Sequence, residues 1–173
     1  MTNQLVRISL LATAAIFLSC CAGYRLGPIK PEALANVQTL AVPLVKNDTL
    51  EPRSAPLVTN AIISQMEQDG TYKLADLETA DAVLNGRIVD IERRQLRSAR
   101  DNQLRSRELN LRIQFDYEII DQASRAVLKR GTIYSETSVF VSSNFQTAER
   151  QAIPVAARQL AIDLVSQISE GYN

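Results

Sequence analysis

The sequence predicts an α+β fold in which two helices pack on one face of a mixed, roughly four-stranded sheet. Three strand-like segments lie between two segments that carry apolar residues at helical spacing. One of the three alternates strictly between apolar and polar side chains, and a short apolar run precedes the whole set. The predicted order is therefore strand, helix, strand, strand, strand, helix, in one domain over residues 37–173.

The chain opens with a segment typical of secreted proteins. Arg7 is the only charged residue before Arg25, and the apolar run over 8–18 ends in Ser19-Cys20-Cys21. A basic start, a short apolar run and a small-residue exit predict a signal peptide over residues 1–20. The run is shorter than the roughly 20 residues that span a bilayer, so we do not expect a transmembrane helix.

The exit of this segment resembles the lipobox of bacterial lipoproteins, and we expect Cys21 to be the lipidated residue. Cleavage before Cys20 is the alternative. Residues 21–36 contain turn-forming Gly and Pro and are predicted to be a tether between lipid and domain. The protein would then meet the membrane through its N-terminal lipid.

Composition excludes several classes of function. The chain has 19 basic and 19 acidic residues, and loss of residues 1–20 removes only Arg7, which leaves a net charge of −1. That balance gives no indication of a nucleic-acid partner. The chain has no histidine and no cysteine after Cys21, which excludes most nucleophilic triads and zinc sites. We therefore expect a protein that is not an enzyme and that holds neither metal nor cofactor.

The first half of the domain predicts a strand, a helix and a further short strand. The apolar run over 37–45 is predicted as a first strand. Because Pro43 cannot donate a ladder hydrogen bond, this strand is expected to be an edge strand or to end near Pro43. Ser54 is the expected N-cap of a helix that ends at Gly70, where glycine favours a left-handed stop. Residues 72–74 are predicted as a short strand.

The middle of the domain predicts three strands. Residues 82–92 are rich in β-branched side chains but contain Asn85-Gly86, a hairpin signal. A hairpin there would leave three apolar residues on its first arm, so we expect a bulge inside one strand. Residues 108–121 alternate strictly, which predicts one buried and one solvated face. The chain then turns at 121–124, and an antiparallel partner strand is predicted over 126–137.

The last element is a predicted helix over residues 146–169, after a loop at 140–144. Because Pro154 lies inside the helical pattern, the helix is expected to be kinked there or to begin there. Its predicted buried stripe is Ile153, Ala156, Ala157, Leu160, Leu164 and Ile168.

Several short motifs in order carry a family resemblance. They are Cys21-Ala22-Gly23-Tyr24, Thr39-Leu40-Ala41-Val42-Pro43, Asn47-Asp48-Thr49-Leu50-Glu51-Pro52, Asp69-Gly70-Thr71-Tyr72, Ala80-Asp81-Ala82-Val83-Leu84 and Ala148-Glu149-Arg150-Gln151-Ala152. Together they resemble the LptE family of lipopolysaccharide-assembly lipoproteins. The resemblance implies a two-helix, four-stranded fold seated in the lumen of the β-barrel LptD. It also implies help in delivering lipopolysaccharide to the outer leaflet of the outer membrane. Ala22 agrees with that location, since an aspartate after the cysteine would favour inner-membrane retention.

The densest charge lies between two predicted strands, over residues 92–108. A guanidinium binds phosphate or carboxylate through two parallel hydrogen bonds, so lipid A phosphates or acidic groups in a barrel lumen are candidate counterparts. The alternative is a solvated hairpin whose charges serve solubility. The residues that we single out for lipopolysaccharide or partner binding are Arg93, Arg94, Arg97, Arg100, Arg105 and Arg107.

Two further segments have a structural and a functional interpretation. The polar residues over 112–118 could contact a partner, but the solvated face of an antiparallel sheet explains them more simply. Residues 47–52 could contact a partner or cap the sheet, and we favour the cap. A second function also fits the early strand and its Asn-rich loop, namely a periplasmic lipoprotein that binds and activates a peptidoglycan synthase.

Overall fold

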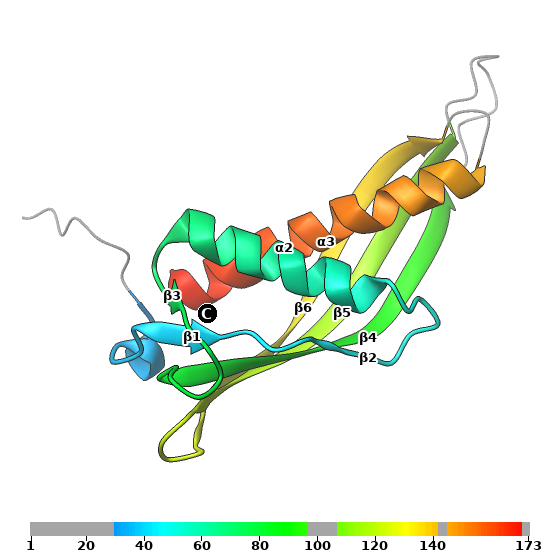
Figure 1. Ribbon diagram of the computed structural model, residues 1–173. Coiled ribbons are helices and arrows are strands. Elements are labelled where there is room, and N and C mark those ends of the chain that lie inside the picture. The colour runs from blue at the N-terminus through cyan, green and yellow to red at the C-terminus, as the bar shows by residue number, and fades with distance from the viewer. Residues whose placement is uncertain (1–29, 97–106, 142–144, 171–173) are drawn as a thin grey trace, which may run out of the picture.

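The computed structural model describes residues 30–96, 107–141 and 145–170 (Figure 1). The predicted signal peptide and Cys21 lie outside these residues. The described elements, in chain order, are η2 (Glu32–Leu34), β1 (Thr39–Ala41), β2 (Lys46–Asn47), α2 (Ser54–Asp69), β3 (Lys73–Leu74), β4 (Ala82–Leu96), β5 (Arg107–Asp121), β6 (Val127–Val141) and α3 (Phe145–Ser169).

The strands form one mixed sheet in the order β3-β1-β4-β5-β6, and β2 pairs with β4 beside this path. β1 runs parallel to both β3 and β4, whereas β4, β5 and β6 form two long antiparallel ladders. Figure 1 shows α2 and α3 lying together over one face of the three long strands. This arrangement confirms the predicted α+β fold, with its helices on one face and its predicted element order.

The core lies between this face and the two helices. Alternate residues of β5, from Leu111 to Ile119, are at most 4% exposed, as the strict alternation predicts. Removal of this apolar surface from water is the main force that holds the helices on the sheet. The whole predicted stripe of α3 is buried against it: Ile153, Ala156, Ala157, Leu160, Leu164 and Ile168.

The structure corrects details in the first half of the chain. The run over 37–45 contains one strand, β1, which ends at Ala41 just before Pro43, as one of the two predicted alternatives has it, and which is not an edge strand because it lies between β3 and β4. Ser54 is the first helical residue, and Arg53 holds the cap position without a side-chain bond. The predicted Ser54 cap is therefore wrong, because its hydroxyl donates to the Glu51 carbonyl at 2.7 Å instead. Gly70 ends α2 in the left-handed conformation, with φ at 72°, as predicted.

Asn85-Gly86 lies within one continuous strand, as predicted, but the bulge is elsewhere. The ladder of β4 with β5 shifts register between Ile88 and Asp90. Glycine is required at 86 for a different reason, since a Cβ there would collide with the ring of Phe115 on the facing strand. Gly86 is therefore needed for the close approach of the Phe115 ring to the backbone of β4, and the register change lies elsewhere.

The second half departs from the prediction at two points. β6 runs to Val141, because its ladder continues until Arg107 of β5 pairs with Val141. The predicted loop therefore cannot include residues 140 and 141, which are strand. The last helix includes Pro154 in its interior, so the alternative in which it begins there is wrong.

Candidate functional site

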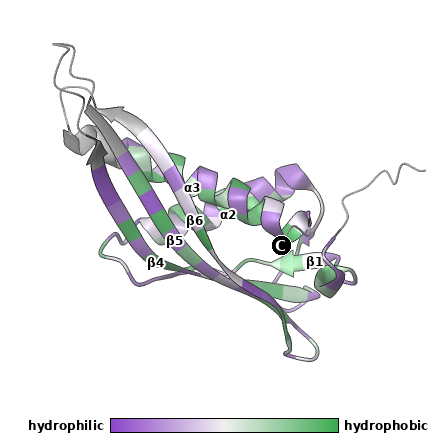
Figure 2. Ribbon diagram, turned by 180° about the vertical axis from the view of Figure 1, so that it is seen from behind, coloured by the Kyte–Doolittle hydropathy of each residue, from purple (hydrophilic) through white to green (hydrophobic). Residues whose placement is uncertain are grey.

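The three long strands have two chemically different faces. The helix face carries the core. The other face, here called the open face, consists of residues 85, 87, 90, 92 and 94 of β4 and the even-numbered residues 110–118 of β5 and 130–138 of β6. Every one of these residues is exposed or half-buried, and no described helix covers them. Figure 2, which views the molecule from behind, shows polar and apolar stripes alternating along these strands.

Strand register brings the polar side chains of the open face into rows. One row aligns Glu92, Arg112 and Glu136, and another aligns Arg87, Asp116 and Thr132. A third aligns Asn85, Glu118 and Arg130. Each of these rows therefore places an acidic group beside a basic one on the neighbouring strand.

Arg112 lies at the centre of this surface. Its Nε lies 3.4 Å from the Glu136 carboxylate, and its guanidinium stacks 4.7 Å from the centre of the Tyr134 ring. Exposed ion pairs of this kind contribute only about 0–1 kcal/mol to stability. Tyr134 remains 54% exposed despite the stacking. Tyr134 and the Arg112–Glu136 pair are therefore partly exposed to solvent and contribute little to the stability of the fold.

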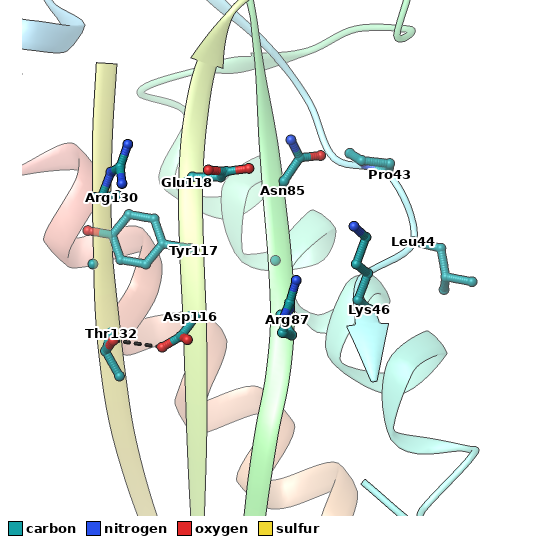
Figure 3. Close-up of a pocket in the computed structure, with 12 residues that line it drawn as sticks. Pro43, Leu44, Lys46, Asn85, Arg87, Asp116, Tyr117, Glu118, Arg130 and Thr132 are labelled. Atoms are coloured by element: carbon teal, nitrogen blue, oxygen red, sulfur yellow. Dashed lines mark hydrogen bonds between the residues drawn. The ribbon is translucent and has the colours of Figure 1, made fainter. Parts of the chain in front are cut away.

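A hollow of about 580 Å³ opens on the same face, between the segment after β1 and the three long strands (Figure 3). Thr132 donates a 2.6 Å hydrogen bond to Asp116 within it. The Tyr117 hydroxyl, also at the hollow, is buried without a hydrogen-bond partner in the described chain, and burial raises its pKa. The charged residues around the hollow are Lys46, Arg87, Asp116, Glu118 and Arg130.

The structure separates the two predicted arginines that it describes fully. Arg94 lies on the open face, bonded at 2.8 Å to Glu92. Arg93 pairs in register with the buried Leu111 and so lies on the helix face, where it bonds Glu51. The strand alternation places these neighbours on opposite sides of the sheet, so they cannot act as one cluster.

The remaining predicted arginines lie at the far end of the sheet. Arg97, Arg100 and Arg105 are outside the described residues. Arg107 is the first residue of β5, and only its backbone is described. Their assignment to lipopolysaccharide or a partner stays a prediction.

The segment 47–52 is organised by its own hydrogen bonds. The Asn47 side chain accepts from the Thr49 amide at 3.0 Å and donates to the Glu51 carbonyl at 2.8 Å. Glu51 in turn holds Arg93. These contacts fit the predicted structural role, although the segment also leaves Leu50 almost fully exposed.

The described residues offer little for chemistry. Among them, no three side chains of the metal-binding types come close enough together to hold an ion. No helix in the described ranges has the length and apolar character needed to cross a membrane.

Sequence reasoning found only part of this surface. The polar residues of β5 were identified but were assigned to ordinary solvation. Those of β6 were missed, because Arg130, Thr132, Tyr134 and Glu136 form a pattern only when aligned with β5. The strict alternation over 108–121 was the signal that could have located them, once the hairpin register was fixed.

Comparison with known proteins supplies a family match. A model described as LptE, Lipopolysaccharide-assembly, matches residues 37–168. No curated protein matches the sequence.

Several solved structures share the fold at low identity. A PelC variant from Paraburkholderia phytofirmans, a dodecamer, is 14% identical with a TM-score of 0.53, over 84% of this chain and 96% of its own. A minor lipoprotein from Acinetobacter baumannii is 14% identical with a TM-score of 0.50, over 77% and 93% of the two chains. Protein XCC0632 from Xanthomonas campestris is 14% identical with a TM-score of 0.54, over 84% and 90%.

Proposed function

Because the chain belongs to the LptE family of lipopolysaccharide-assembly proteins, we propose that it plugs and supports an LptD-like β-barrel. In that role it assists the transport of lipopolysaccharide and its insertion into the outer leaflet. The family is associated with the outer membrane and is not enzymatic. The chain's lack of histidine agrees with a binding role.

The open face is the observation that carries this proposal. The lumen of an outer-membrane barrel is polar, and its wall presents charged side chains of both signs. A sheet face that carries charges of both signs, as in the row Glu92, Arg112 and Glu136, suits such a wall, because each charge can find an opposite neighbour. The hollow beside Lys46 and Arg130 gives the same face a recess that side chains of the barrel can enter.

The arginine-rich end of the sheet is the proposed contact for lipopolysaccharide. Arg94 is available on the open face near the end of β4, with its side chain 63% exposed. Arg97, Arg100, Arg105 and Arg107 follow it in sequence toward and into β5. Reversing the charge of Arg97, Arg100 and Arg105 should lower lipopolysaccharide binding, measured with purified lipopolysaccharide and the full chain. Unchanged binding and unchanged recovery of the barrel would refute this assignment.

The proposal includes a lipid anchor at Cys21, after removal of residues 1–20. A chain held by both lipid and barrel has two attachments to the outer membrane. Cys21→Ser should therefore remove the lipid, seen by mass spectrometry of the N-terminal peptide. Outer-membrane fractionation of that variant shows whether the barrel alone retains the domain.

Co-purification tests the barrel partnership. The variant Arg87→Glu, Arg94→Glu, Arg112→Glu changes three cations of the open face and leaves the core intact. We expect it to recover much less β-barrel from detergent-solubilised outer membranes than the wild-type chain does. The matched control is Arg53→Glu, Lys73→Glu, Arg158→Glu, which makes the same charge change away from the open face. Equal loss in both variants would point to net charge and would contradict a specific role for the open face.

A further inference from the structure

β6 is an edge of the sheet. It is the last strand in the order β3-β1-β4-β5-β6, and its 15 residues pair only with β5 within the described chain. In an antiparallel ladder, alternate peptide groups of such a strand point away from the sheet and are free to bond another strand. Long unprotected edges of this kind pair readily with a further strand.

The charges of β6 are self-complementary about its centre. Arg130 and Glu136 lie three positions before and three positions after Ile133. Both lie on the open face, because they share parity along the strand. When two copies of β6 run antiparallel with Ile133 opposite itself, Arg130 of each copy faces Glu136 of the other. That register creates two cross-strand ion pairs, whereas shifting it by two residues in either direction creates none.

The same register suits the other side chains of the strand. On the open face it sets Thr132 opposite Tyr134, an aromatic and β-branched pair that stabilises antiparallel strands. Tyr134 is half exposed in the single chain and would gain cover. On the helix face it sets Gly131 opposite Ser135, so small residues meet where the two edges come closest.

Lys129 is the residue of β6 that could oppose this pairing, because a charge on the helix face of an edge strand usually blocks it. Its ammonium instead donates a 2.8 Å hydrogen bond to the Gln167 carbonyl of α3. The Lys129 ammonium is thereby held against α3 of the same chain and away from the edge of the sheet. Opposite it, in the register above, the second copy presents Thr137, which is uncharged.

α3 borders the edge strand, because Asp163 of α3 accepts a 2.7 Å hydrogen bond from Ser135 of β6. A twofold axis through Ile133 and perpendicular to the sheet would bring the two α3 helices to the same side of a continuous sheet.

We propose that two copies of the chain pair through β6 in the antiparallel register centred on Ile133, with the α3 helices side by side. This self-association goes beyond the proposed barrel function and stands on different observations. The strand that pairs with β6 is β6 of a second copy, because this strand carries both Arg130 and Glu136 at the spacing that the pairing requires.

Disulfide crosslinking between two tagged copies of the full chain tests the register. One copy carries Arg130→Cys, the other carries Glu136→Cys, and membranes from cells that make both are treated with a mild oxidant. We expect a covalent heterodimer that joins the two tags. Two copies that both carry Arg130→Cys should give no such product, because those positions lie far apart in this register, and they control for Cys20 and Cys21.

Charge exchange gives an independent readout by tag co-purification. Arg130→Glu places like charges opposite each other twice and should lower recovery of the second copy by about tenfold. Arg130→Glu combined with Glu136→Arg should restore it, whereas Lys73→Glu, on β3, should change nothing. The proposal is overturned if the double variant stays as weak as the single one. It is equally overturned if the 130–136 crosslink does not form, or if Glu136→Cys captures a different protein in place of the second copy.

Discussion

The helix face and the open face of β4, β5 and β6 are made by alternate residues of the same three strands, yet different forces determine them. On the helix face, residues such as Phe115 and Ile113 are fully buried and belong to the same hydrophobic core as residues of α2 and α3. On the open face, neighbours such as Gln114 and Asp116 keep contact with solvent. Packing fixes the identity of the first set, and little in the fold requires the second.

The difference shows where function has room to reside. A buried apolar residue can change only at the expense of stability, while an exposed charge in a weak ion pair can change almost freely. The charges of both signs on the open face of the three strands are therefore available for partner recognition. The predictions below separate the two faces by their effect on stability, from the largest effect to the smallest.

Truncation at the centre of the helix face should cost the most. Phe115→Ala removes a fully buried ring and should lower the free energy of unfolding by about 3–5 kcal/mol. Chemical denaturation followed by circular dichroism measures the loss. Gln114→Ala, one residue along on the open face, is the control and should change stability little. Similar losses in both variants would remove the distinction between the faces.

Filling the space beneath the Phe115 ring should cost somewhat less. Gly86→Ala places a methyl group against that buried ring and should destabilise the fold by about 1–3 kcal/mol. Adding Phe115→Leu should recover part of the loss, since the two sites share one contact. Gly131→Ala, whose Cβ would lie 3.0 Å from the Tyr117 ring, should be milder. An additive double variant would show that the two residues do not compete for this space.

These two residues also show what the sequence could reveal. The alternation over 108–121 and the stripe of α3 correctly identified the buried residues of β5 and a buried stripe of α3, because each pattern follows the period of a single element. Gly86 was interpreted as a bulge signal, since the ring that requires it belongs to another strand. The bulge near Val89 and the extension of β6 to Val141 likewise depend on pairing with β5. Cross-strand register, which local patterns do not encode, accounts for these errors.

The same reason explains why the open face was undervalued. Arg112 and Asp116 are visible in the sequence as a polar alternation, which any half-buried sheet shows. Their alignment with Arg87, Thr132 and Glu136 requires the register of two ladders. Arginine density instead directed attention to residues 92–108, where Arg93 and Arg94 prove to lie on opposite faces.

Tyr72 should give the core a pH dependence at high pH. Its hydroxyl donates a 2.9 Å hydrogen bond to the Ile168 carbonyl near the end of α3, and burial raises its pKa to about 12. An unfolded chain loses this proton near pH 10, whereas the folded chain keeps it, so this contribution to stability is present below pH 10 and falls between pH 10 and 12.

Tyr72→Phe should therefore cost about 1 kcal/mol at pH 7 and should flatten the decline above pH 10. Thermal unfolding at a series of pH values measures both effects. Tyr134→Phe is the matched control, because that residue lies on the open face and is 54% exposed. A wild-type decline that Tyr72→Phe leaves unchanged would assign the pH dependence to other groups.

Removal of a charge from the open face should have the smallest effect on stability. Arg112→Ala removes the ion pair with Glu136 and the stacking on Tyr134. Because the side chains of Glu136 and Tyr134 are about half exposed, the change should cost less than about 1 kcal/mol. Chemical denaturation measures this loss of stability. Co-purification of the β-barrel is measured on the same variant, and we expect the recovery of the barrel to fall. A loss as large as that of Phe115→Ala would mean that the open face holds the fold together.

Photo-crosslinking from the open face tests the central claim most directly. A photoreactive amino acid is placed singly at Arg112, Gln114 or Tyr134, and for comparison at Ser64 or Gln68 of α2, in the full chain within intact cells. If the open face is the surface that meets the barrel wall, the three open-face positions give crosslinks to a large outer-membrane β-barrel, stronger than those from α2. Crosslinks from α2 alone, or none to a barrel from any position, would contradict the account.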